Sequence, residues 1–256
     1  SLQEKSLSQL VSEVSPGTVV VISEQHTLLA HHDKQVLLLE ELKRQNRRVS
    51  VGLEFLSYSF QDETNQYLAG QLTDTDFQKQ VGWGSIDFNM YKKQILFSLG
   101  SQGYTLAINA PRSLTNRISK VGLSQLTQKE RDLLPPNFQL GNSLYRERFV
   151  EVMQNHIPAE ALDRYFEAQS TWDDTMAWVA SDFIQSHPDQ VLVILVGDFH
   201  AQYGGGLPDR LRARGVSRLK VISQVQLGLG TPADDEAEMV PHSRYGVRAD
   251  EIWVSR

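Results

Sequence analysis

The sequence contains no cysteine, which excludes a disulfide framework, a thiolate metal site and a cysteine nucleophile. It also has no apolar run approaching the roughly 20 residues that a membrane-spanning helix needs. Residues 1–15 lack the basic and then apolar pattern of a signal peptide. We therefore expect the chain as given to be soluble.

The sequence also has fewer basic than acidic residues. The chain has 25 lysines and arginines against 31 aspartates and glutamates, which gives a net charge of −6. Affinity for nucleic acid depends on clustered lysine and arginine, so this balance argues against a nucleic-acid partner. A chain of 256 residues that is 40% hydrophobic can bury a sizeable core, and we expect a single domain spanning residues 1–256.

Short apolar, β-branched runs alternate along the chain with segments of helical period. This alternation is typical of an α/β fold in which helices flank a mostly parallel central sheet. Strands are expected at residues 18–23, 49–55, 104–109, 191–197 and 219–225, with a short edge strand at "EIWV" near the C-terminus. Helices are expected at residues 31–45, 62–69, 91–101, 127–134, 158–186 and 208–214.

Two segments depart from the strand and helix alternation. No strand pattern occurs in residues 114–156, so we predict an α-helical insertion there. Residues 230–246 are polar and contain proline, which predicts a loop before the edge strand.

Polar or ionisable side chains follow four of the expected strands. His26 comes after the first strand, Glu54 ends the second, Arg112 follows the third, and Asp198 and His200 follow the fourth. Ligands of open parallel α/β sheets bind outside the carboxyl ends of the strands. If all four strands are parallel, these side chains converge at one edge of the sheet.

The chemistry of this edge allows several roles. Glu54 lies in an apolar run, where an unpaired carboxylate is costly, and His26 and His200 are its natural partners. A histidine held by a carboxylate can take a proton from water, which is sufficient for ester hydrolysis. The same three residues are acceptable ligands for a divalent metal such as zinc or manganese. Each histidine could equally be a packed or capping residue without catalytic function.

Several neighbouring residues also have more than one role open to them. Glu24 is placed either to orient His26 or to cap the following helix. Arg112 is suited either to clamp a carboxylate or to pair with a buried acid. The supporting candidates for a catalytic site are therefore Glu24, Arg112 and Asp198.

Three further features have simpler interpretations. His31 and His32 begin an expected helix, where they are either solvated side chains near the helix start or members of a functional cluster with His26. Gln169 and Asp173 interrupt an apolar helical stripe, which predicts a buried polar relay. The glycines at 204–206 form a tight turn or a backbone cradle for an anion.

The segment "SEQHTLLAHHDKQ", residues 23–35, resembles the glutamate, histidine and glutamine signature of the ChaN-like haem-binding lipoproteins. That family belongs to a wider superfamily with the TraB/Tiki proteins and the erythromycin esterases. The similarity recurs in order at "GLEF", at Trp83 and Tyr91 followed by "NAPR", at "FEAQSTWDDTMA" and at "LVGDFHAQYGGGLPDRL", and it spans most of residues 18–225. The sequence departs from the family pattern at Ser23, where glycine is usual, and at Asp198 and Phe199, where G-x-G-H is common.

The resemblance implies a protein of the bacterial cell envelope that takes part in haem or iron acquisition. It implies a periplasmic or surface lipoprotein of the outer membrane, which meets the membrane only through a lipid anchor outside this sequence. Haem is then expected on a helical region at a homodimer interface. Tyrosine is the axial ligand expected in the family, because a phenolate is a hard anionic donor that suits ferric iron. The candidate ligands are Tyr145, Tyr165 and Tyr203, with His156 as an accessory group. We favour Tyr145 as the iron ligand, because arginines next to it are placed to meet the haem propionates.

The wider superfamily implies an alternative function. In its erythromycin esterase branch, a histidine after the first strand activates water, and a glutamate and a second histidine shape the site. His26, Glu54 and His200 match those places, so the alternative is a hydrolase acting on a small molecule. The related Tiki proteins are metal-dependent, which keeps a divalent cofactor open beside haem. Whether the protein is an enzyme or a carrier is left open by the sequence.

Overall fold

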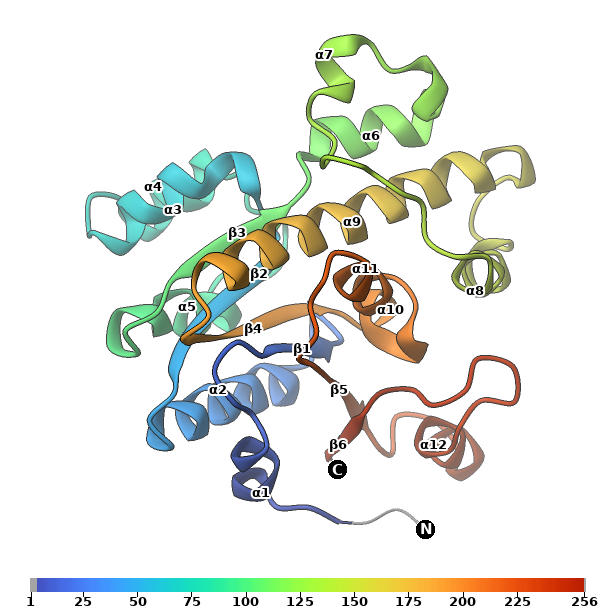
Figure 1. The fold of residues 1–256 in the computed structure, drawn as a ribbon. Coiled ribbons are helices and arrows are strands. Elements are labelled where there is room, and N and C mark those ends of the chain that lie inside the picture. The colour runs from blue at the N-terminus through green and yellow to red at the C-terminus, as the bar shows by residue number, and fades with distance from the viewer. Residues whose placement is uncertain (1–3, 256) are drawn as a thin grey trace.

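A six-stranded parallel sheet forms the centre of the molecule (Figure 1). The computed structural model describes residues 4–255. The parallel sheet flanked by helices confirms the predicted α/β fold. The strands lie in the order β3-β2-β4-β1-β5-β6. Their bounds are β1 Val19–Glu24, β2 Arg48–Ser57, β3 Thr105–Asn109, β4 Gln190–Gly197, β5 Leu219–Gln226 and β6 Glu251–Ser255.

The two central strands β1 and β4 are buried at every position. Their sequences, "VVVISE" and "QVLVILVG", are β-branched and apolar because helices cover both faces of the sheet and leave no side to solvent. β1 and β4 pair in register from Val19 opposite Leu192 to Glu24 opposite Gly197. The two strands therefore end side by side, and the residues that follow them start from the same edge.

One face of the sheet is covered by α9 (Leu162–Ser186), which crosses β3 and β4 and packs against α11 (Leu207–Ala213) (Figure 1). The other face is covered by α2 (Leu29–Arg44) with α1 (Leu7–Ser12) and α5 (Asn89–Leu96). The remaining α-helices are α3 Gln61–Leu68, α4 Asp74–Gln80, α6 Arg112–Val121, α7 Gln128–Arg131, α8 Ser143–Met153, α10 Asp198–Ala201 and α12 Pro232–Met239. Short 3₁₀ turns lie at Tyr58–Phe60, Phe97–Gly100, Leu123–Gln125, Ala159–Ala161 and Gln202–Gly204.

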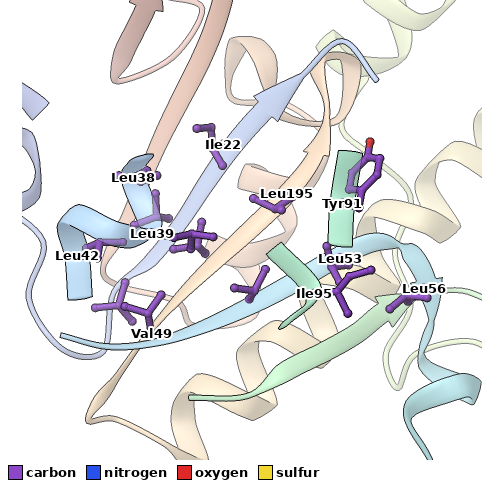
Figure 2. Close-up of a cluster of buried hydrophobic side chains, with 14 of the residues drawn as sticks. Ile22, Leu38, Leu39, Leu42, Val49, Leu53, Leu56, Tyr91, Ile95 and Leu195 are labelled. Carbon is purple, nitrogen blue, oxygen red and sulfur yellow. The ribbon is translucent and has the colours of Figure 1, made fainter. Parts of the chain in front are cut away.

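A large apolar core fills the space between the sheet and α2 (Figure 2). Leu38, Leu39 and Leu42 project from α2 onto β1, β2 and β4, and each is fully buried. Tyr91 of α5 lies at the edge of this cluster with its ring in the core. A second core lies on the opposite face, where α9 and α11 meet the sheet.

Two sequence predictions concern the segments outside the sheet. Within the described chain, no strand lies between β3 and β4, and residues 114–156 contain helices and turns. The prediction that residues 230–246 form only a loop is wrong, because α12 begins there at Pro232. The side chain of Thr231 accepts the Asp234 N–H and the Asp234 carboxylate accepts the Thr231 N–H, which closes a capping box. Proline at the first helical position supports the same start.

Across residues 4–255, none of the helices has both the length and the apolar character that crossing a membrane requires.

Helix α2 offers a matched test of the core. Leu39 is fully buried, whereas Leu37 on the same helix is 54% exposed. Leu39→Ala should lower the free energy of unfolding by about 2–5 kcal/mol, because it removes buried methyl groups and leaves a cavity. Leu37→Ala should change it by less than about 0.5 kcal/mol. Urea denaturation of both variants measures the difference, and equal losses would contradict this packing of α2.

Candidate functional site

The carboxyl ends of β1, β2 and β4 bring several ionisable side chains together. Glu24 ends β1, Glu54 lies near the end of β2, and His200 lies on α10 directly after β4. His26 follows β1 by two residues, and Asp173 reaches the group from α9. The topology thus places the predicted His26, Glu54 and His200 at one edge of the sheet.

His200 lies between two carboxylates. Its Nδ1 is 2.7 Å from Oδ1 of Asp173 and its Nε2 is 3.3 Å from Oε1 of Glu54. Burial lowers the pKa of His200, but the two carboxylates outweigh burial and raise this pKa to about 10. The ring is therefore an imidazolium at neutral pH, with both nitrogens acting as donors. It has no lone pair with which to accept a proton or bind a metal.

Glu54 stays ionised although it is buried. Burial alone would raise the pKa of Glu54, but His200, His26 and the backbone N–H of Gly197 hold this pKa below its ordinary value. The Gly197 N–H donates to Oε2 of Glu54 at 2.6 Å. Glu54 therefore has the cationic and hydrogen-bonding partners that its apolar strand requires.

His26 keeps one nitrogen away from any carboxylate contact. Its Nδ1 lies 2.9 Å from Oε1 of Glu24, and the side chain is 36% exposed. A Cβ on Gly197 would lie 3.0 Å from Nε2 of His26 and 3.5 Å from Oε2 of Glu54, so glycine is needed for the ring to lie this close. Burial lowers the pKa of His26, but Glu24 and Glu54 outweigh it and raise this pKa above 6.5.

Glu24 is held by groups from two helices. The Tyr91 hydroxyl and the Gln35 side-chain amide both donate to its carboxylate, and Gln94 donates to Gln35 at 3.1 Å. Glu24 therefore orients His26, and it does not cap α2, whose first turn has no side-chain cap. Tyr91 and Gln35 are site residues whose roles sequence reasoning missed. Gln35 is separated from the histidines by one helical turn, and that spacing is the signal that could have found it.

The predicted polar relay of Gln169 and Asp173 is confirmed. Gln169 donates to the Tyr145 hydroxyl at 3.0 Å and its amide lies 3.1 Å from Nδ1 of His200. Tyr145 in turn donates to Oδ2 of Asp173 at 2.8 Å. Tyr145, which we favoured as the iron ligand, lies on α8 and is only 2% exposed. Its phenol supports Asp173 from inside the protein.

A cavity of about 600 Å³ opens over the two histidines. Its floor contains Glu24, His26, Asp198 and His200, and its walls come from α6, α8 and α9. Most of the wall is apolar, formed by Phe149, Val152, Met153, Ala168, Trp172 and Phe199. Tyr165 also lies in the wall and is 39% exposed. The site is thus an apolar chamber above an ionised floor.

Two of the three positions at which the sequence departs from the family pattern, Ser23 and Asp198, contact each other. The Ser23 hydroxyl donates to Oδ1 of Asp198 at 2.5 Å. Burial raises the pKa of Asp198, and this hydrogen bond offsets part of that effect. A serine in place of the usual glycine therefore supplies the donor that the aspartate needs.

Four predicted site residues lie elsewhere. Arg112 is exposed and donates to the Gly82 carbonyl at 3.1 Å, outside the cavity lining. His156 is exposed in the turn after α8. Tyr203 lines a different, smaller cavity. Arg148, one of the arginines expected to meet haem propionates, is 7% exposed and also lines that smaller cavity.

The expectation that His31 and His32 are solvated is wrong. They are 0% and 2% exposed. Nδ1 of His31 accepts the Gln25 N–H at 3.0 Å, and burial lowers the pKa of His31 to about 4, so it is neutral. Nε2 of His32 donates to the His26 carbonyl at 2.9 Å. Both rings therefore hold the backbone that presents His26.

The expected zinc or manganese site is not supported. Among residues 4–255, no group of three or more histidine, aspartate or glutamate side chains is arranged to hold a metal ion. Both ring nitrogens of His200 already contact carboxylates, Asp173 at 2.7 Å and Glu54 at 3.3 Å.

The fold and this edge define an α/β protein with a buried acid–base cluster beneath an apolar cavity. A model of the family described as "Haem-binding uptake, Tiki superfamily, ChaN" matches residues 10–211, and the chain belongs to this family. A search of curated proteins finds no match.

Solved structures share the fold. The structure described as "Cofacial heme binding to ChaN of Campylobacter jejuni" matches with a TM-score of 0.65 and 19% identity, over 88% of this chain and 86% of that one. The type III effector HopBA1 matches with a TM-score of 0.50 and 12% identity, over 98% and 93%. An erythromycin esterase mutant, EreC H289N, matches with a TM-score of 0.50 and 12% identity, over 91% and 76%. At these identities the likeness concerns the fold alone.

The pKa of His200 predicts how stability depends on pH. Because this pKa rises from an ordinary 6.5 to about 10 on folding, the stabilisation is complete below pH 6.5 and is lost as the pH rises through about 10. The free energy of unfolding should fall by on the order of a few kcal/mol across that range. Asp173→Asn should flatten the slope, because it removes the carboxylate nearest to the ring.

Urea denaturation at several pH values measures this slope. Asp163→Asn is the matched control, since Asp163 lies on the same helix but pairs with the exposed Arg146. It should retain the wild-type slope. A steep slope that persists in Asp173→Asn would show that His200 is not held as an imidazolium by Asp173.

Proposed function

We propose that this protein binds ferric haem in the cavity of about 600 Å³ and acts as a carrier in haem or iron uptake. The observation that carries the proposal is the apolar chamber with a tyrosine exposed in its wall. Membership of the haem-binding uptake family supports it, as does the fold shared with a ChaN protein described as binding haem.

Tyr165 is the residue best placed to hold the iron. A tyrosine phenolate is one of the axial ligands that proteins use for haem iron. Tyr165 lines the cavity and donates no hydrogen bond within the described part of the chain, whereas the Tyr145 hydroxyl is buried against Asp173. Tyr165 therefore replaces Tyr145 as our candidate ligand.

The cavity suits the rest of a haem as well. Its apolar walls match a flat, largely apolar macrocycle, in the way that cofactor pockets usually do. The carboxylates of Glu24, Glu54 and Asp198 at or beneath the floor disfavour anionic propionates there. The propionates would consequently face the mouth of the cavity.

The location and assembly of the protein belong to the same proposal. We propose an envelope lipoprotein, periplasmic or on the cell surface, that pairs with a second copy when it carries haem. The family resemblance supports this location. Exposed apolar side chains on α8 and at Tyr165 support the pairing, since Leu144 and Val152 are 41% and 47% exposed.

Titration with ferric haem tests the carrier function. Wild-type protein should give a saturable, high-spin tyrosinate spectrum. Tyr165→Phe should remove that spectrum and weaken binding at least about tenfold, because only the phenolate oxygen is lost. Tyr104→Phe is the matched control, since Tyr104 is 48% exposed but packs on Phe183 and His187 outside the cavity.

Three results would overturn this assignment. An unchanged tyrosinate spectrum in Tyr165→Phe would exclude Tyr165 as the ligand. If the wild-type protein gives no specific haem spectrum, the proposed haem-carrier function is wrong. Loss of the spectrum in His26→Ala, together with an unchanged spectrum in Tyr165→Phe, would place the iron beside His26 at the floor of the cavity.

A hydrolase is the second candidate function, and the open nitrogen of His26 favours it. Glu24 fixes Nδ1 of the ring, which leaves Nε2 as the nitrogen that can take a proton. In this reaction a water oxygen attacks an ester carbonyl carbon while Nε2 accepts the water proton. The carbon–oxygen bond of the ester then breaks, and the proton passes to the departing alcohol. His200 cannot replace His26 as the base, because its pKa is near 10.

Activated aryl esters test this candidate. The rate should rise with pH through a pKa above 6.5, because the base must be neutral and the pKa of His26 is raised. His26→Asn should lower kcat/KM at least about 100-fold. Gln25→Ala, which changes the neighbouring cavity residue, should retain most of the activity. Activity that survives His26→Asn would exclude this mechanism.

A further inference from the structure

A second cavity of about 130 Å³ lies on the other side of Tyr145. Asn142, Tyr145, Arg148 and Tyr203 line it, together with the backbone at 204–205, and it shares no lining residue with the larger cavity. The volume is sufficient for several water molecules or a small polar group. Neither function proposed above uses this space.

Arg148 gives the second cavity a buried positive charge. The residue is 7% exposed, and its guanidinium donates only to neutral oxygens: the carbonyls of Phe199 and Gln202 at 3.3 Å and Oε1 of Gln202 at 2.8 Å. Within residues 4–255 no carboxylate lies at ion-pair distance from it. A guanidinium stays protonated in proteins. The rings of Phe199 and Tyr203, 4.3 and 4.8 Å from the guanidinium, offset part of this charge. Burying the charge is still costly without an anion to balance it.

The neighbouring backbone is held in an unusual conformation. Tyr203 has φ +61°, in the left-handed region that a bulky residue rarely adopts, and Gly204 follows with φ +70°. The Tyr203 ring is fixed between two guanidinium groups, 4.8 Å from Arg148 and 5.6 Å from Arg248. Gly205 must lack a side chain, because a Cβ there would lie 2.9 Å from the Tyr145 ring. The fold thus maintains strained backbone in order to line this cavity.

Two further donors line the cavity. The Tyr203 hydroxyl and the side-chain amide of Asn142 donate no hydrogen bond within the part of the chain that the structure describes. The nearby carboxylates are already engaged, Glu147 with Arg244 and Glu151 with the Tyr245 hydroxyl. The cavity therefore combines a charged donor with two neutral donors.

We propose that this cavity binds a small oxyanion, either a carboxylate or a phosphate group, with Arg148 as the principal contact. A guanidinium matches both anions through paired N–H groups, and the binding would supply the negative charge that the buried Arg148 lacks. The cavity borders a more open groove of about 610 Å³ through the shared Tyr245, so the rest of a larger anionic ligand would lie there. This site is independent of haem binding.

NMR titration with sodium phosphate and with sodium acetate tests the proposal, with sodium chloride at equal ionic strength as the reference. The Nε–Hε signal of Arg148 and the amide signals of Gly204 and Gly205 should shift saturably, with a dissociation constant on the order of 1 mM. The melting temperature should rise with the same anion. Saturation by only one of the two salts identifies which anion the site takes.

Two variants on α8 make the test specific. Arg148→Lys keeps the charge but loses the paired donors, so anion affinity should fall at least about tenfold. Arg146→Lys is the matched control, because Arg146 is exposed and pairs with Asp163. Absence of a saturable shift in the wild-type protein, or equal affinity in Arg148→Lys, would overturn the proposal. If Arg148→Lys does not fold, wild-type shifts that leave Arg148, Gly204 and Gly205 unmoved would also overturn it.

Discussion

The imidazolium of His200 between Asp173 and Glu54 is the interaction on which the rest of the site depends. It joins three elements that are distant in sequence, α9, α10 and β2. If either carboxylate were removed, the His200 imidazolium would stay buried without that partner. A buried charge that has lost its partner destabilises the folded protein far more than the intact ion pair does. The Tyr145 hydroxyl and the Gly197 N–H stabilise the remaining negative charge. Tyr145 is buried for this reason, which explains why the tyrosine with arginine neighbours is not the one that faces the cavity.

Two histidines at the same edge have opposite capacities because their contacts differ. Both ring nitrogens of His200 meet carboxylates, so the ring keeps its proton. His26 meets one carboxylate and retains an open nitrogen beside Gly197. The missing side chain of Gly197 therefore matters as much as the residues that are present, since a methyl group there would occupy the position of the imidazole. The acid–base chemistry at the floor of the cavity therefore depends on which ring nitrogens of His26 and His200 contact a carboxylate.

The sheet and the position of the site could be predicted from sequence, because β-branched runs mark buried strands and parallel strands end at one edge. The hydrogen-bond and ion-pair partners of each site side chain could not be predicted in this way. Nothing in the local pattern indicates that Ser23 meets Asp198 across 175 positions, or that His31 and His32 turn inward from the start of a helix. The burial of Tyr145 could not be predicted either, because helical period indicates which residues share a face, whereas the packing of α8 on α9 decides what covers that face. Polar residues and proline predict a loop at residues 230–246, but the local capping box at Thr231 and the proline at the first helical position start a helix there.

The arrangement of the two cavities constrains how the proposed activities relate. A macrocycle held from Tyr165 would fill the space above His26, so haem and an ester substrate compete for the same chamber. Binding of haem would therefore inhibit hydrolysis directly, without any conformational change. The oxyanion cavity shares no wall residue with that chamber, and the side chain of Tyr145 lies between them, with its ring in one and its hydroxyl on Asp173 beneath the other. Arg148 also contacts Phe199 of the larger cavity, through a hydrogen bond to its carbonyl and a guanidinium 4.3 Å from its ring. An anion beside Arg148 would therefore act on the histidines through Phe199 as well as through the Tyr145 to Asp173 hydrogen bond.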